Sequence, residues 1–106
     1  MKIAILNTTI LTNDGDFSLN TITLDEAKEI IKGQEILSAV GHQSTAEILT
    51  TLLGVEIPMN RILFSQEVGQ FAICFKLNGR PPEGEILTKE QLEEIGFTFK
   101  LLERVS

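Results

Sequence analysis

Hydrophobic and polar positions along the chain follow two different periods, one typical of helices and one typical of strands. Three segments have helical spacing, and each begins with a Ser or Thr that a Glu or Gln follows three residues later. This is the sequence signature of a capped helix start, and a glycine at the other end is a common helix stop. The pattern predicts short amphipathic helices from Thr23 to Gly33, from Ser44 to Gly54 and from Thr88 to Gly96.

Strand-like segments lie between and around these helices. The clearest covers residues 71–77, where large apolar residues alternate with Ala72, Cys74 and Lys76. Residues 3–6 form a continuous apolar run, as expected of a strand that is buried on both faces. Residues 97–101 alternate again, and weaker strand patterns cover residues 19–23, 36–40 and 61–65.

This order of elements predicts an α/β (α+β) fold in a single domain over residues 1–106. We expect a single mixed β-sheet of about five to six strands, flanked by three short helices. The composition agrees, because 42% of the 106 residues are hydrophobic and 23% are charged, as in ordinary globular proteins. A chain this short leaves much of its surface exposed, which favours pairing with a second copy in a homodimer.

The charge of the chain narrows the range of ligands. Nine basic and 15 acidic residues give a net charge of −6, which disfavours bulk DNA binding because that depends on Lys and Arg. Residues 38–82 are nevertheless neutral, with three acids and three bases, and they hold the single histidine. A small anionic ligand fits this stretch if Arg61 and Arg80 converge on it.

Cys74 is the single cysteine, so the chain forms no internal disulfide, and we expect a cytoplasmic protein. The apolar runs are too short for a signal peptide or a membrane span. Cys74 lies within a predicted strand and has no adjacent base, which indicates a core residue. One His and one Cys cannot supply the usual ligands of zinc, and no phosphate-loop or hydrolase motif occurs, so we expect neither a metal nor a cofactor.

His42 lies between a predicted strand and the predicted cap residue Ser44. The first turn of a helix offers unpaired N–H groups to a phosphate, and Gly41 allows the backbone to approach closely. His42 would then lie beside the bound phosphate. A histidine that merely fills the loop, or that hydrogen-bonds a carbonyl, fits the same spacing.

Residues 78–84 form a loop that prolines stiffen and glycines turn. Such a loop would present Arg80 and Glu83 with little freedom, for phosphate and for a ribose hydroxyl respectively. It is equally compatible with a solvated connection. Arg61, at a predicted strand start, is either a surface charge or an anion ligand.

The end of the first predicted strand carries Asn7, followed by Thr8 and Thr9. Open sheets commonly bind ligands at the ends of their strands, and these amide and hydroxyl groups are suitable for that purpose. Asn and Thr are also common in turns, where they hydrogen-bond the local backbone, and a turn would explain the same residues.

Taken together, the Leu6-Asn7 strand end, residues 38–45 with Gly-His-Gln-Ser-Thr, the Asn60-Arg61 pair and the Arg80-Pro-Pro-Glu-Gly84 loop resemble the viral anti-CRISPR ring nuclease family. Members of that family degrade cyclic tetra-adenylate, the second messenger of type III CRISPR defence. They occur in viruses, phages and bacterial mobile elements. The similarity covers essentially the whole chain.

The resemblance implies roles for particular residues. It implies His42 as the general acid, Glu83 as the active-site carboxylate, and Arg61 and Arg80 as ligand-binding cations. It also implies Asn7 as a ligand contact. Gly41 and Ser44 are candidate substrate-binding residues because they belong to the predicted helix start. A serine that many members carry after the Asn has no clear counterpart, Thr8 and Thr9 being the nearest hydroxyls.

The implied function is metal-independent cleavage of cyclic tetra-adenylate by a homodimer in the cytoplasm, that of the host cell if the protein is viral. The ribose 2′-OH would attack the neighbouring phosphate, and the twofold symmetry of the ring would match a twofold dimer. Two alternatives stay open. One is a module that binds the cyclic nucleotide without cleaving it, and the other is a small DNA-binding regulator of a mobile element.

Overall fold

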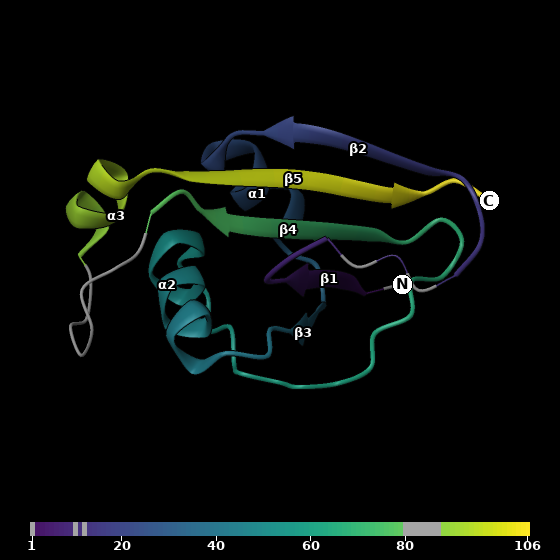
Figure 1. Cartoon of the computed structure of the whole chain (residues 1–106), viewed down its shortest axis with the longest axis horizontal. Helices are drawn as coiled ribbons and strands as arrows, with labels where there is room; N and C mark the ends of the chain where they lie inside the picture. The colour runs from purple at the N-terminus through teal and green to yellow at the C-terminus, as the bar shows by residue number, and fades with distance from the viewer. Residues whose placement is uncertain (1, 10, 12, 80–87) are drawn as a thin grey trace.

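The computed structural model describes residues 2–9, 11, 13–79 and 88–106. Within that part, five strands form one mixed sheet in the order β2-β5-β4-β1-β3, and three helices accompany it (Figure 1). This confirms the predicted α+β fold with a single mixed sheet. The strands are β1 (Ile3–Leu6), β2 (Phe17–Ile22), β3 (Ile36–Ala39), β4 (Phe71–Leu77) and β5 (Phe97–Arg104), and the helices are α1 (Leu24–Ile31), α2 (Gln43–Leu53) and α3 (Lys89–Ile95).

β1 lies inside the sheet and is parallel to both of its neighbours, β3 and β4. The carboxyl ends of these three strands therefore share one edge of the sheet, next to α2 and α3 in Figure 1. β4, β5 and β2 continue the sheet in antiparallel pairs. The chain ends lie toward the opposite edge in the same view.

The helices pack against one face of the sheet, where they build the main core. Ala27, Leu49 and Leu92, one from each helix, are fully buried in this core. The sheet contributes Ile5 and Phe99 together with the other inward-facing residues of β1, β4 and β5. The predicted alternation in β4 and β5 is confirmed, because their large apolar residues point to this helical face.

The other face of the sheet is covered differently. Its buried cluster combines small side chains of the inner strands with Leu6, Leu102 and Phe64, the last from the long connection between α2 and β4. All four residues of β1 are buried, which confirms the prediction of a strand covered on both sides. Toward the carboxyl end of β4, this helix-free face is polar.

The helix starts were predicted correctly at two positions. Thr23 and Thr88 each form a complete capping box, with Glu26 and with Gln91 respectively. The prediction that Ser44 caps α2 is wrong. The helix begins two residues earlier than that cap implies, because the extended backbone of His42 occupies the cap position and the His42 carbonyl accepts the Ala46 N–H at 3.0 Å.

The strand predicted over residues 61–65 is also wrong, since no strand is present between α2 and β4 among the described residues. Hydrogen bonds at both ends hold this segment. Asn60 N–H donates to the Val40 carbonyl at 2.8 Å, and the Gln66 side chain donates to the Leu102 carbonyl at 3.0 Å. Ile62 and Leu63 are exposed while Phe64 is buried, which is not the alternation of a strand.

Candidate functional site

The shared carboxyl edge of β1 and β3 brings the polar residues of two distant segments together. Leu6 pairs with Ala39 in the parallel register, so Asn7 and the segment from Val40 to His42 leave the sheet side by side. Asn7 is half-buried and His42 is exposed. The edge therefore places an amide and an imidazole where a ligand could reach both.

His42 is the N-cap residue of α2, and its side chain makes no capping hydrogen bond. The first turn of this helix also contains no acidic residue. The N–H groups of Gln43, Ser44 and Thr45 precede the first helical hydrogen bond, which Ala46 makes. These groups and the helix dipole favour an anion at this end of α2.

Arg61 lies beside the same loop. Its Nη2 and Nε atoms both donate to the Gly41 carbonyl oxygen, at 3.1 and 3.4 Å. The neighbouring Asn60 side chain donates to the Ser38 carbonyl at 2.7 Å, and the Ser38 hydroxyl donates to the Pro58 carbonyl at 2.6 Å. The connection after α2 therefore holds the segment that leads into His42, and it brings a guanidinium group next to that residue.

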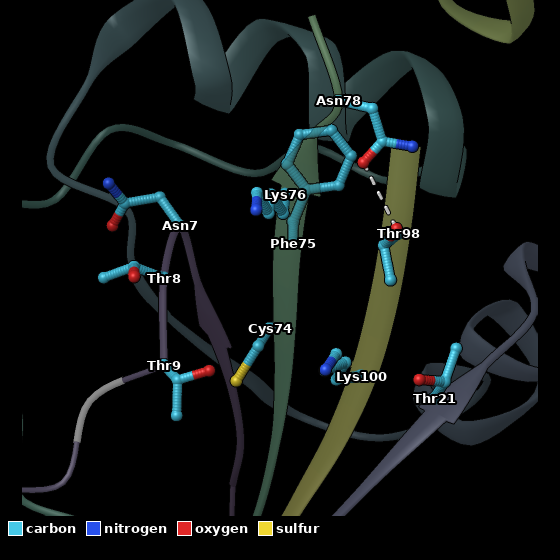
Figure 2. Close-up of a pocket in the computed structure, with 10 residues that line it drawn as sticks. All are labelled: Asn7, Thr8, Thr9, Thr21, Cys74, Phe75, Lys76, Asn78, Thr98 and Lys100. Carbon is cyan, nitrogen blue, oxygen red and sulfur yellow. Dashed lines mark hydrogen bonds between the residues drawn. The ribbon is translucent and has the colours of Figure 1, made fainter. Parts of the chain in front are cut away.

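Thr8 and Thr9 follow Asn7 and are both exposed. The Thr9 hydroxyl points toward the sulfur of Cys74 (Figure 2). Cys74 is buried, as predicted, and this burial raises the pKa of its thiol, while the contacts with Thr9 and Lys100 oppose the increase. The thiol is thus held in its neutral form.

A cavity of about 580 Å³ opens on the helix-free face beside Asn7, Thr8 and Thr9 (Figure 2). Sequence reasoning did not identify the residues on its floor as site residues. The alternation in β4 had placed Lys76 and Cys74 on one face, but only the pairing of β4 with β5 brings Lys100 and Thr98 beside them. The remaining lining residues are Thr21, Phe75 and Asn78.

Some predicted site residues cannot be placed. Arg80 and Glu83 lie outside the described residues, as does the rest of the loop from residue 81 to 84. Ser44 is described, and it is exposed in the first turn of α2 rather than at the cap. The structure therefore brings together Asn7, Gly41, His42 and the Arg61 guanidinium at one edge of the sheet.

Two further findings concern the described residues alone. Within them, no group of three or more His, Cys, Asp or Glu side chains is arranged to hold a metal ion. In the same part of the chain, no helix has the length and apolar character needed to cross a membrane.

Fold and site together define a small α+β protein with a polar site at the ends of parallel strands. The family model described as STIV B116-like matches residues 3–99, so the chain belongs to the STIV B116-like family. The structure is similar to that of B116 of Sulfolobus turreted icosahedral virus, with a TM-score of 0.84 over 98% of this chain and 100% of that one. At 17% identity, this likeness concerns the fold.

Relatives of higher identity come from a bacterium and from viruses. The chain is 42% identical to YddF of Bacillus subtilis strain 168 over 99% of both chains. It is 42% identical to protein 26 of Sulfolobus islandicus filamentous virus, over 80% of this chain and 73% of the relative. ORF117 of Acidianus two-tailed virus is 38% identical, over 84% of this chain and 79% of the relative.

Proposed function

We propose that the protein is a metal-independent ring nuclease that binds and cleaves cyclic tetra-adenylate and so switches off type III CRISPR signalling. The observation that carries this proposal is the position of His42 at the start of α2, directly after the Gly41 carbonyl that the Arg61 guanidinium contacts. The sequence resemblance supplies the identity of the substrate, and the viral relatives are consistent with a protein of viruses or mobile elements.

The helix start and Arg61 suit the phosphate of such a ligand. The first-turn N–H groups of α2 point out of the helix start, where an anion would bind, and that turn contains no acidic side chain to repel it. The Arg61 guanidinium uses only part of its donor capacity on the Gly41 carbonyl, since an arginine carries five N–H donors. Its remaining donors are available to a phosphate oxygen.

His42 suits the proton transfer. RNA cleavage of this type needs no external nucleophile, because the ribose 2′-OH attacks the adjacent phosphorus and the bond to the 5′-oxygen breaks. The products are a 2′,3′-cyclic phosphate and a free 5′-hydroxyl. His42 would donate the proton that the leaving 5′-oxygen requires, and its exposed imidazole with no capping bond is free to do so.

Other groups would orient the ring. Asn7, which leaves the neighbouring strand, would hydrogen-bond the ligand, and Thr8 or Thr9 would supply the hydroxyl that the family's serine provides. By resemblance, Arg80 would contact phosphate and Glu83 would orient the ribose or accept the 2′-OH proton. A homodimer would present one such set of groups to each half of the ring.

The decisive experiment is incubation of the purified protein with cyclic tetra-adenylate, followed by chromatography of the products. We expect linear oligoadenylates that end in a 2′,3′-cyclic phosphate. His42→Ala should slow their formation by about 10²–10⁴-fold, the usual contribution of a positioned general acid. Thr51→Ala is the matched control, since it alters an exposed residue of the same helix away from its start and should retain the parental rate.

Two results would contradict the proposal in different ways. A ligand that stays intact after long incubation while binding tightly would indicate a module that only sequesters the nucleotide. A protein that ignores the ring but shifts duplex DNA in a salt-dependent manner would indicate a regulator.

A further inference from the structure

The cavity on the helix-free face has the chemistry of an anion site. Lys76 and Lys100 stand on neighbouring strands and on the same side of the sheet, because Lys76 pairs with Thr98 and Lys100 pairs with Cys74 (Figure 2). They are diagonal neighbours, within reach of one ligand. Like charges at such positions repel each other unless an opposite charge lies between them.

No carboxylate neutralises these two lysines among the described residues. The residues that line the cavity in that part of the chain include no Asp or Glu, although the chain carries 15 of them against nine Lys and Arg. The cross-strand partners of Lys100 are Cys74 and Thr21, both uncharged. Within the described part of the chain, this acidic protein therefore keeps a pair of positive charges without a carboxylate partner in a hollow of its own surface.

The remaining groups are hydrogen-bond donors that suit phosphate oxygens. Hydroxyls of Thr8, Thr21 and Thr98 line the cavity, and hydroxyls can donate to an anion. The Thr98 hydroxyl currently donates to the Asn78 side chain at 3.3 Å, a long bond that a ligand could replace. A volume of about 580 Å³ lies in the range of small-molecule sites.

We propose that this cavity, with Lys76 and Lys100 as its two cations, binds a phosphate group of a nucleotide. Asn7 belongs both to the cavity and to the strand edge that carries His42. The cavity and the helix-end site are thus contiguous, and a ligand with several phosphates can occupy both. That the ligand is cyclic tetra-adenylate rests on the proposed function. The inference that a phosphate binds between the lysines does not rest on the proposed function.

The test uses two probes that separate the possible sources of the phosphate. Cyclic tetra-adenylate offers phosphodiesters, and adenosine 5′-monophosphate offers a phosphomonoester. Dissociation constants are measured by calorimetry for the parental protein and for the Lys76→Gln/Lys100→Gln double variant. Lys2→Gln/Lys32→Gln is the matched control, because it removes the same two charges from exposed lysines before β1 and after α1.

We expect the double variant to bind at least one probe about tenfold more weakly or worse, as loss of charge-assisted hydrogen bonds implies. The control should change affinity by less than about twofold. If the double variant loses affinity for cyclic tetra-adenylate alone, the cavity is a phosphodiester subsite. If it loses affinity for the monophosphate alone, the cavity binds a separate ligand. Amide shifts of Thr21, Thr98 and Lys100 in NMR spectra should accompany binding.

Unchanged affinity for both probes in the double variant would overturn the inference, as would the failure of both to bind the parental protein. These results are distinguishable from failure of the proposed function. If the monophosphate binds through the lysines while cyclic tetra-adenylate is neither bound nor cleaved, only the proposed function fails. If the double variant cleaves and binds the ring as the parental protein does, and binding of the monophosphate does not depend on the lysines, only the cavity assignment fails.

Should the double variant unfold at a lower temperature, Lys76→Gln alone provides the test, since Lys76 is exposed.

Discussion

Arg61 donates two hydrogen bonds to the carbonyl oxygen of Gly41, the residue immediately before His42. The same contact fixes the path of the loop and fixes the position of the cation. A ligand phosphate at the start of α2 would therefore meet a guanidinium that is already held in place. Preorganised charge of this kind favours binding because little side-chain freedom is lost when the ligand arrives.

Replacement of Arg61 should affect binding, whereas replacement of His42 should affect the rate. Arg61→Ala removes a charge that meets the ground-state phosphate and also frees the Gly41 carbonyl, so affinity should fall by about tenfold or more. His42→Ala should leave affinity nearly unchanged and slow cleavage, at a cost of roughly 3–5 kcal/mol in the barrier. Single-turnover rates and separate equilibrium binding distinguish the two. Parental affinity in Arg61→Ala would show that its side chain only anchors the loop.

Cleavage should survive a metal chelator. The proposed reaction uses the substrate's own 2′-OH and a histidine proton, so it has no step that requires a divalent ion. The rate in EDTA should equal the rate in buffer with magnesium. Loss of activity in EDTA that a divalent ion restores would rule out this mechanism.

The helix caps should differ in their contribution to stability. Thr23→Ala and Thr88→Ala each remove a complete capping box, and each should lower the free energy of unfolding by about 1 kcal/mol. Ser44→Ala should cost less, because Ser44 lies inside α2 and does not cap it. Urea titration of the three variants measures the difference. Equal losses would mean that Ser44 does cap the helix in solution.

Self-association should depend on the connection between α2 and β4. Leu63 is fully exposed and Ile62 beside it is 42% exposed, and large exposed apolar groups often mark protein interfaces. Light scattering should report twice the chain mass of 11.7 kDa for the parental protein. Leu63→Asp should shift this toward the monomer, while Val105→Asp, at another exposed apolar position, serves as control. A Leu63→Asp dimer of parental affinity would place the interface elsewhere.

Cys74 should react slowly with iodoacetamide in the folded protein. Burial raises the pKa of this thiol above its ordinary value of 9.0, and the thiolate is the reactive form. At pH 8, labelling of the native protein should be about tenfold slower or more than labelling in urea. The neutral thiol contributes stability below pH 9.0, and this contribution is lost as the pH rises through the higher folded-state pKa. Equal labelling rates would show that the thiol is not protected.

Local rules were enough to predict most of the fold. The capping signals of Thr23 and Thr88 were correct because a cap depends on residues within one helical turn. The same signal failed at Ser44, because the three-residue path from β3 to α2 determines where the helix begins, and that path brings His42 to the cap. The strand predicted at residues 61–65 failed because consecutive residues Ile62 and Leu63 are both exposed, which breaks the alternation expected of a strand.

Candidate site residues could be predicted only where their place beside a predicted strand or helix pointed to them. Asn7 was proposed because open sheets commonly bind ligands at strand ends, and His42 because it precedes a predicted helix start. Their shared edge follows from the parallel pairing of β1 with β3. Lys100 was not identified, because its proximity to Lys76 depends on the register between β4 and β5. No local pattern in a single sequence fixes that register.

The position of β1 has a consequence for how the protein is made. This strand leaves the ribosome before β4, which is one of its two partners, so Ile5 is unpaired on that side until Ile73 has been synthesised. Until then, a fully apolar strand has an unpaired edge, which is the kind of surface that promotes aggregation. We expect nascent chains that stall before residue 71 to need chaperones, and the ligand-binding edge to form only once β4 has been synthesised and has closed the sheet.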